Sequence, residues 1–470
     1  MTTSKRIARH KIARIEPLLA IAVVLLTACL LTPGSAAAKS LVPGRLDQLA
    51  ASGEISQATH DEAINTYAQA RILRKQLTGD RRAALNYTIS VAERLAHTDR
   101  LTVDRIDPVM LIIKRNTEWF KNNGPAAYGA RQRFGTSRII FQYFPGCGWQ
   151  IHPLANFSRL NAVWTDKSAK ARRSLRAYAN ELINLSVPRG GFTAWEYYFN
   201  FGGGSPPWIS SIAQGTAIQS LSRTANALKD PGISAVVGSS LAAFSTDAPL
   251  GLRVDSSGGN HYLIYSFNKD LLVLNAFIQS LIGLHDTAEL TGNPVAQQLF
   301  DAGEVAARVE TPLHDTGAWS LYALHGNESD LSYHLLLRDF LGGLCERTTI
   351  DAYCKARDNF TVDTTTAPEI SKLAAAIKNG RVAVRFNLSK ISRVTVSLYK
   401  NGVSVGGTST NIGYGPRRFT FNTTRKSGTY TLRVEATDLA SNWRKTEMKI
   451  KVKKSKKKHQ AKKSHKSESV

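Results

Sequence analysis

The chain has 470 residues and a formal net charge of +25, with 61 lysines and arginines against 36 aspartates and glutamates. This length is enough for two or three domains. No spacing of cysteine and histidine has the form of a metal site, and no glycine-rich phosphate-binding loop is present. The sequence therefore indicates no metal and no nucleotide cofactor, and its positive charge favours a polyanionic partner through long-range attraction.

The chain begins with the features of an export signal. A basic stretch precedes the apolar run 17–31, which is too short for a comfortable membrane span, and small residues suit cleavage before Lys39. Cys29 ends a Leu-Thr-Ala-Cys sequence of the lipoprotein type, so a lipid anchor there, or an uncleaved anchor, is an alternative to free secretion. We predict a signal peptide over 1–38 and a secreted or cell-surface protein. No later stretch is apolar enough to cross a bilayer.

Export places the cysteines in an oxidising compartment, where they are expected to pair. Cys345 and Cys354 would close a short loop and are the predicted disulfide. Cys147 is left over in this assignment.

The region 39–125 has apolar residues at helical spacing, and we expect either an adaptor or part of the outer layer of the core. Segment 136–153 is strand-like, with a turn at Pro145-Gly146. From about 157 to 343 the pattern is one of paired helices separated by short glycine-rich loops. Helix pairs of this kind commonly close into a toroid.

Four sequence blocks lie within this helical region. They are PPWISSIAQGTAIQSLSR (206–223), YSF (265–267) with VLNAFIQSLIGLHD (273–286), LHDTGAWSLY (313–322) and SYH (332–334). In this order they resemble the C-terminal domain of the D-glucuronyl C5-epimerases, which convert glucuronate to iduronate within heparan-type chains. The resemblance covers about 150 to 345. It implies an (α/α) barrel over 126–358, with loops at one end that line a groove.

The resemblance also implies which residues transfer protons. The tyrosines proposed for this role in the family match Tyr322 and Tyr333, and Tyr265 is a third candidate in the same blocks. The alternative for each is a buried tyrosine that only packs and hydrogen-bonds. The family usually has two glutamates directly ahead of the tyrosine that matches Tyr265, and Leu263 and Ile264 stand there instead. This departure removes the expected carboxylate base.

Further candidates come from the same region. Glu196 follows a glycine-rich loop and is a replacement for the missing base, with a surface glutamate as the alternative. The uronate carboxylate needs cationic or hydrogen-bonding neighbours so that the charge developing on it is tolerated. The candidates for substrate binding are Arg223, Arg338, His334, Trp208, Gln214 and Asn275.

The pattern changes to short alternating strands after a threonine-rich linker that ends at Pro368. Asn401-Gly402 is a strong hairpin signal between two of these strands. Their regular spacing predicts an immunoglobulin-like β-sandwich over 365–452, a type of module that usually acts as a spacer or adhesion unit. The basic tail 453–470 is either a solubility tail or an anchor for anionic cell-wall polymer.

The predicted protein is therefore a multidomain, mainly α-helical toroid or barrel followed by an all-β module. Its predicted activity is C5 epimerisation of uronate residues in an anionic polysaccharide, without cofactor, metal or nucleic acid. Two alternatives stay open: a lyase, if the substituent at C4 leaves before reprotonation, and a non-catalytic glycan-binding protein. A homodimer also stays open.

Overall fold

A computed structural model describes residues 41–166, 168–423 and 427–452, so the predicted export signal and basic tail lie outside the described residues. The chain divides into two compact units. Unit 1 runs to Thr136 and adds Ile140–Ile151 and Tyr197–Pro207, while unit 2 holds the rest. Among the described residues, no helix has the length and apolar character needed to cross a membrane.

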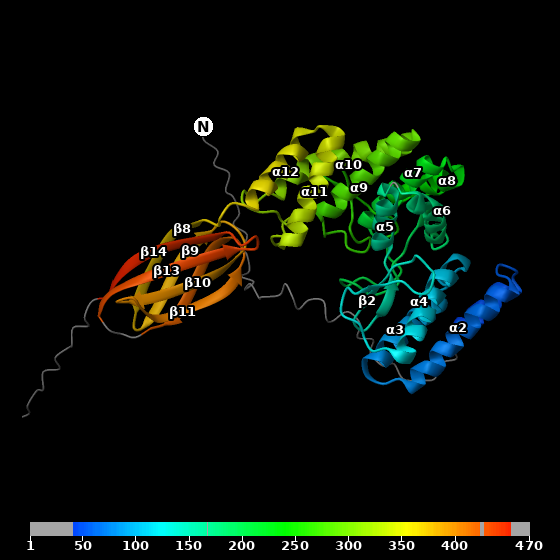
Figure 1. Cartoon of the computed structure of the whole chain (residues 1–470), viewed down its shortest axis with the longest axis horizontal. Helices are drawn as coiled ribbons and strands as arrows, with labels where there is room; N and C mark the ends of the chain where they lie inside the picture. Colours follow the sequence, from blue (N-terminus) through cyan, green and yellow to red (C-terminus); the bar gives the residue numbers. More distant parts are fainter. Residues whose placement is uncertain (1–40, 167, 424–426, 453–470) are drawn as a thin grey trace, which may run out of the picture. The chain divides into compact units, whose positions relative to one another are not determined.

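Unit 1 is a group of helices with a small antiparallel sheet (Figure 1). Its elements are α1 (Leu41–Ala51), α2 (Gln57–Gln76), α3 (Gly79–His97), α4 (Val103–Asn122), β1 (Arg131–Gln132), β2 (Phe141–Phe144) and β3 (Gly148–Ile151). Asn116 of α4 fixes the helix to this sheet, because its amide donates to the carbonyl of Trp149 at 2.7 Å and accepts the Trp149 N–H at 2.8 Å. A Cβ at Gly148 would lie 2.3 Å from Asn116 Oδ1, so only glycine fits this junction.

Unit 2 begins with helices that follow one another in antiparallel pairs. They are α5 (Pro153–Thr165), α6 (Ala169–Ile183), α7 (Ser211–Leu228), α8 (Pro231–Ser240), α9 (Leu274–Thr291), α10 (Pro294–Leu313), α11 (Leu331–Thr348) and α12 (Asp351–Asp363), with the short 3-10 helix η1 (Leu241–Ala243). Two hairpins lie in the connections: β4 (Val187–Arg189) with β5 (Phe192–Ala194), and β6 (Arg253–Ser256) with β7 (Gly259–Tyr262). The helices α5, α7, α9 and α11 pack on one another in a row, and each also packs on its even-numbered successor.

The row has a tight centre where α7 and α9 run parallel. A Cβ at Gly215 would lie 2.7 Å from Ser280 Cα, and one at Gly283 would lie 2.2 Å from the Gly215 carbonyl, so the two backbones touch there. Farther along, Ser222 donates to the Thr287 hydroxyl at 3.1 Å. Within the described residues α11 does not pack substantially onto α5, so the row shows no closure into the predicted toroid.

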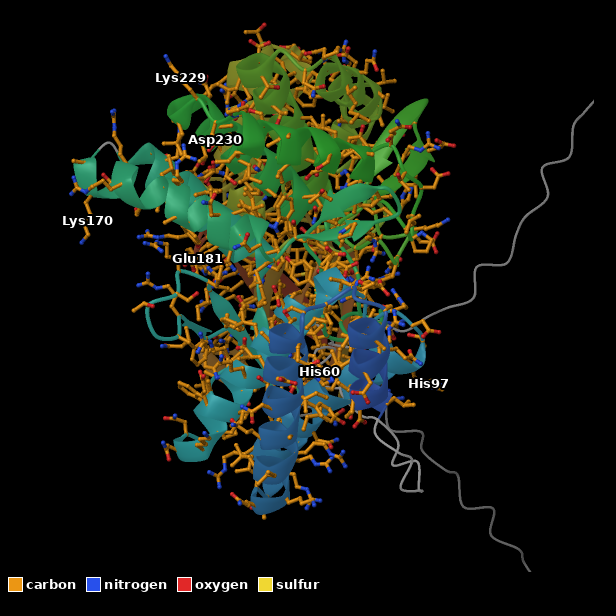
Figure 2. All side chains as sticks on the ribbon, turned by 90° about the vertical axis from the view of Figure 1, so that its right-hand side faces the viewer. His60, His97, Lys170, Glu181, Lys229 and Asp230 are labelled. Carbon is orange, nitrogen blue, oxygen red and sulfur yellow. A yellow bond between two sulfur atoms is a disulfide. The ribbon has the colours of Figure 1, made fainter. Side chains whose placement is uncertain are left out.

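Polar caps determine where several of these helices begin. Asp230 accepts the N–H groups of Gly232 and Ile233 and starts α8, directly after Lys229 ends α7 in a left-handed conformation (Figure 2). Glu181, near the end of α6, accepts hydrogen bonds from Ser137 and Arg138, so it fixes the connection between β1 and β2 to this helix. The Asp230 cap is local and follows from the sequence, whereas the Glu181 contacts join segments that are distant in sequence.

Unit 2 continues into an all-β region (Figure 1). Its strands are β8 (Ile370–Lys378), β9 (Arg381–Leu388), β10 (Ser392–Lys400), β11 (Val403–Ile412), β12 (Gly415–Asn422), β13 (Gly428–Asp438) and β14 (Trp443–Val452). They form two antiparallel sheets, ordered β11-β10-β13-β14 and β12-β9-β8, around one shared hydrophobic core. The predicted hairpin is present, with Asn401 and Gly402 at positive φ between paired Lys400 and Val403.

The predicted disulfide is confirmed, because Cys345 of α11 and Cys354 of α12 are bonded to each other. None of the cysteines in the described part of the chain is free, so the expectation that Cys147 is left over is wrong. Cys147 is also buried, at 2% exposure.

Candidate active site

The three predicted tyrosines lie near the starts of helices of the row. Tyr265 lies in the connection between β7 and α9, Tyr322 lies in the connection between α10 and α11, and Tyr333 lies in the first turn of α11. Asp330 caps α11 by accepting the Tyr333 N–H at 2.8 Å, which sets the start of this helix.

The structure brings these tyrosines together with Trp208 into one aromatic row, which we call the tyrosine cluster. The rings of Tyr322 and Tyr333 meet edge to face with centroids 4.9 Å apart. The rings of Trp208 and Tyr265 meet in the same way at 5.6 Å. The two pairs are joined, because the phenol of Tyr322 is hydrogen-bonded to that of Tyr265. Trp208 and Tyr333, which are more than 100 residues apart in the sequence, therefore belong to the same cluster.

An apolar patch lies directly against this cluster. Tyr265 and Tyr322 pack on a group of buried side chains made of Ile212, Ile264, Val273, Ala276 and Ala323. Exposure increases along the cluster, from buried Trp208 through half-buried Tyr265 and Tyr322 to Tyr333, which is 42% exposed. The cluster thus has one end in the core and the other at the surface.

The protonation state of Tyr322 follows from its burial. The pKa of this phenol is raised to about 12, mainly by burial and also by the neighbouring Tyr333 and Asp330, while the hydrogen bond with Tyr265 opposes the shift. The Tyr322 phenol is therefore protonated and uncharged near neutral pH. Sequence reasoning missed Asp330, whose charge acts on Tyr322. Its position three residues before Tyr333 is the usual one for a helix cap and was the available signal.

Unused hydrogen-bonding groups lie at the starts of two parallel row helices. The hydroxyl of Ser211 and the side-chain oxygen of Asn275 are buried and have no hydrogen-bond partner in the described structure. They stand at the beginnings of α7 and α9, whose N-cap positions, Ser210 and Val273, make no side-chain cap bond. The N-terminal end of a helix carries partial positive charge and attracts anions. Asn275 was among the predicted binding residues.

Glu196 is a buried ion-pair partner, which corrects the alternative of a surface glutamate. Its carboxylate lies 2.7 Å from the Arg189 guanidinium, and both side chains are nearly inaccessible, at 0% and 8% exposure. Arg189 also donates to the carbonyls of Pro249 and Leu250. A carboxylate held in this way stabilises the β4–β5 hairpin, and a role as proton acceptor would require this ion pair to open.

Gln214 and His334 have structural partners. The Gln214 amide bonds both backbone groups of Trp195 and is fully buried. His334 accepts the Ser320 N–H through Nδ1, bonds the Phe360 carbonyl through Nε2 and stacks on Trp319 at 3.9 Å. Burial lowers the pKa of His334 to about 4, so the ring is neutral. Both ring nitrogens are thus bonded within the protein, and the role of His334 in holding a carboxylate stays a prediction.

The predicted arginines lie elsewhere. Arg223, near the C-terminal end of α7, pairs with Asp286 at 2.7 Å, and Arg347 pairs with the same carboxylate at 2.6 Å. Since the tyrosine cluster lies by the N-terminal ends of the row helices, Arg223 is not brought to it. Arg338 pairs with its neighbour Asp339 on the surface of α11. The described residues contain no group of three or more metal-binding side chains suited to hold an ion.

Comparison with known proteins identifies the segment that contains the cluster. The family model of the D-glucuronyl C5-epimerase C-terminus matches residues 189–362. Residues 189–362 belong to this family. A D-glucuronyl C5-epimerase of Caenorhabditis elegans is 30% identical over 132 residues, which cover 25% of this chain and 21% of that protein. An uncharacterized protein of Methanocaldococcus jannaschii is 25% identical over 171 residues, or 35% of this chain and 56% of that protein. The chain thus spans about a fifth and about half of these curated relatives.

Solved structures give weaker similarities. A polysaccharide lyase aligns with a TM-score of 0.35 and 12% identity, covering 66% of this chain and 85% of that chain. A β-L-arabinofuranosidase from Geobacillus stearothermophilus aligns with a TM-score of 0.23 and 8% identity, covering 88% and 91%. Similarities at this level carry no argument about fold or function.

Within the C5-epimerase C-terminal segment, the departure from the family motif has a structural consequence. Leu263 is fully buried and Ile264 is 7% exposed, and Ile264 belongs to the apolar patch under the cluster. The two positions that usually carry glutamates are therefore core positions in this chain. The cluster keeps its tyrosines but has no carboxylate on that side.

Proposed function

We propose that this protein acts on uronate residues of an anionic polysaccharide by exchanging the proton at C5. The observation that carries the proposal is the tyrosine cluster, in which Tyr322 hydrogen-bonds Tyr265 and contacts the Tyr333 ring within the C5-epimerase segment. Tyrosine hydroxyls can donate and accept protons in catalysis. Family membership supports a uronate-active carbohydrate enzyme, and the finer assignment to epimerisation is our proposal.

In this reaction the C5–H bond breaks and its proton goes to a base. The electron pair moves toward the neighbouring carboxylate, and a proton donor on the opposite face of the ring forms the new C5–H bond. Tyr322 is protonated, as a donor must be, although its raised pKa makes it a weaker acid than a free phenol and so contributes to slow turnover. Tyr265 or Tyr333 would then relay the abstracted proton, with the exposed Asp330 as the nearby carboxylate. A tyrosine without a stronger base beside it abstracts slowly, so we expect slow turnover.

The carboxylate of the sugar needs stabilisation as charge develops on it. We propose that Asn275 and Ser211 provide it, because their buried polar groups lack partners at the uncapped starts of α9 and α7. In this proposal Asn275 and Ser211 take the role expected for the arginines, because Arg223 forms an ion pair with Asp286.

A non-catalytic glycan-binding protein is the second candidate. The observation that favours it is the burial of Leu263 and Ile264 where the family usually has glutamates. Binding through the tyrosine cluster would survive this change, whereas proton abstraction would be weakened.

We also propose that the protein is exported. The predicted signal peptide and the Cys345–Cys354 disulfide support this location, because disulfides persist in oxidising compartments. We further propose that the helical row is followed by an immunoglobulin-like module and by a basic tail that binds cell-wall polymer.

One incubation separates the candidates. The purified protein is mixed with heparosan-type polymer in deuterated water, and the recovered polymer is analysed by nuclear magnetic resonance and ultraviolet absorbance. Deuterium at C5 supports the proposed exchange. New absorbance from an unsaturated sugar would assign a lyase. Neither change, together with measurable binding, would assign the non-catalytic candidate.

A further inference from the structure

The segment 314–330, which we call the tyrosine loop, is attached to the C-terminal β region through Glu328. This side chain is buried, with its residue only 6% exposed. Its Oε1 accepts the backbone N–H of Ile391 at 2.8 Å, and its Oε2 accepts that of Tyr414 at 2.8 Å. Both donors belong to the β region, whereas Glu328 lies six residues after Tyr322. One carboxylate therefore joins the loop to two separate points of the β region.

Glu328 is also part of the fold of the tyrosine loop. Leu321 and Glu328 form an antiparallel bridge, and the N–H of Tyr322 donates to the Asn327 carbonyl at 2.9 Å. The backbone on either side of Tyr322 thus depends on the segment that Glu328 fixes. A displacement of Glu328 would move the neighbours of the Tyr322 phenol.

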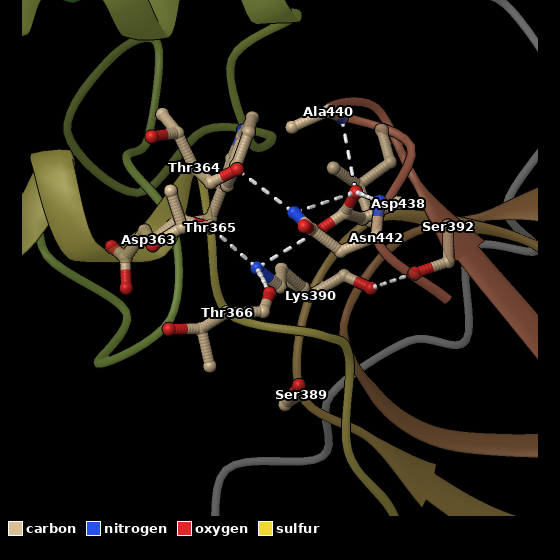
Figure 3. Close-up of polar contacts among 12 residues, drawn as sticks. Asp363, Thr364, Thr365, Thr366, Ser389, Lys390, Ser392, Asp438, Ala440 and Asn442 are labelled. Carbon is tan, nitrogen blue, oxygen red and sulfur yellow. Dashed lines mark hydrogen bonds and ion pairs between the residues drawn. The ribbon is translucent and has the colours of Figure 1, made fainter. Parts of the chain in front are cut away.

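A second attachment lies in the first half of the loop. Lys390, which is 1% exposed, places its ammonium group 5.3 Å from the centre of the buried Trp319 ring. The same ammonium pairs with Asp438 at 2.9 Å and donates to the carbonyls of Asp363 and Thr366, at the end of α12 (Figure 3). The pair with Asp438 lies within the β region, and the other contacts of this ammonium connect the β region to the end of α12 and to the tyrosine loop.

The groups around Glu328 favour the charged carboxylate, which accepts the two backbone hydrogen bonds. Burial raises the pKa of this carboxyl, and the two backbone donors together with Arg417 and Lys390 oppose the shift. Arg417 itself donates to the carbonyls of Gly413 and Tyr414, so it shapes the β-region segment that binds Glu328. The β region supplies all of the groups that compensate for the burial.

We infer that the β region is a positioning element of the candidate active site, which holds the tyrosine loop, and with it Tyr322, through Glu328. The sequence suggested a spacer that takes no part in the site. The attachment can be tested without any activity, and only its effect on turnover rests on the proposed function.

The test is hydrogen–deuterium exchange of the full chain, read by mass spectrometry on peptides from the tyrosine loop. Glu328→Ala removes both acceptors, and Glu328→Gln keeps one carbonyl oxygen. Glu447→Gln, an exposed change on β14, is the matched control. We expect loop amides to exchange about 5- to 150-fold faster in Glu328→Ala, less so in Glu328→Gln, and as in the native chain in the control. Loop exchange that equals the native rate in Glu328→Ala would overturn the inference.

A variant in the β region shows whether faster exchange comes from loss of the contact or from a folding defect of the loop itself. Arg417→Met loosens the β-region segment and removes a cation that favours the charged form of Glu328, while every side chain of the tyrosine loop stays as it is. We expect the loop peptides to exchange faster while peptides from α7 and α9 do not change. Unchanged loop exchange in this variant would also count against the inference. If the native chain exchanges C5 protons, kcat should fall in Glu328→Gln with little change in KM. If it does not, the proposed function fails and the amide exchange still decides the attachment.

Discussion

Tyr322 shows how one residue combines a motif position with a physical environment. Its place in the C5-epimerase segment was predictable, because the resemblance rests on short blocks in a fixed order. The raised pKa was not, since it depends on burial and on Tyr265, Tyr333 and Asp330 from other segments. Sequence also placed His334 and Gln214 among the binding residues, although their hydrogen bonds go to the backbone of the protein itself. Motif adjacency does not distinguish a ligand contact from a structural one.

The burial of Ile264 changes what restoring a family glutamate would do. Ile264→Glu places a carboxylate in the apolar patch, so we expect the free energy of unfolding to fall by about 3–5 kcal/mol. Ile264→Val, the matched control, should cost only about 1 kcal/mol. Denaturant unfolding of both variants measures the difference. Equal stability of the glutamate and valine variants would show that the position is open to solvent.

At the scale of helices and strands, the regular elements were predictable and their connections were not. Helical periodicity indicated the paired helices, and Asn401-Gly402 indicated a hairpin that the structure contains. The tyrosine loop has no regular pattern, and its conformation depends on bonds to Leu272 and the β region, far away in sequence. Such contacts cannot be read from local periodicity.

Asp363, at the end of α12, should make stability depend on pH. Burial, with the nearby Asp315, raises the pKa of its carboxyl to about 6 from an ordinary 3.8, while Lys390 opposes the shift. The folded chain favours the protonated carboxyl of Asp363. The contribution of this group to the free energy of unfolding is therefore complete below the pKa of the unfolded chain, and it is lost as the pH rises through the folded pKa of about 6. Asp363→Asn removes this loss. We expect its thermal midpoint to exceed the native one by about 2–4 °C well above the folded pKa.

The same comparison near or below the unfolded pKa is the control, because the native carboxyl is then protonated and the two midpoints should agree. An equal difference at both pH values would mean that Asp363 acts through packing and not through its charge.

The Cys345–Cys354 disulfide should stabilise the α11–α12 pair. It closes a loop with a sequence separation of 9, for which the expected stabilisation is about 2–3 kcal/mol. The double variant Cys345→Ala/Cys354→Ala should unfold at correspondingly lower denaturant concentration. Reductant should lower the stability of the native chain by more than that of the double variant, in which only the bond of Cys147 is left to reduce. A native chain that reductant does not affect would contradict the structural role of this bond.

At the scale of the whole molecule, charge governs the expected partner. The net charge of +25 predicts that binding to a uronate polymer weakens with salt, because salt screens exposed charges. We expect at least about a tenfold loss of affinity between low salt and roughly 0.5 M salt, measured by calorimetry, with uncharged dextran as the control. Salt-independent binding, or equal binding of dextran, would contradict a polyanionic substrate.

The most direct test of the central claim is the rate of deuterium incorporation at C5 of a uronate polymer by the native chain and by Tyr322→Phe. The variant keeps the ring and removes the hydroxyl. Tyr399→Phe on β10, another half-buried tyrosine, is the control. Because loss of a general acid–base group costs about 10²–10⁴-fold, we predict a loss of that size in Tyr322→Phe and none in the control. Incorporation by Tyr322→Phe at the native rate would contradict the assignment of proton transfer to the tyrosine cluster.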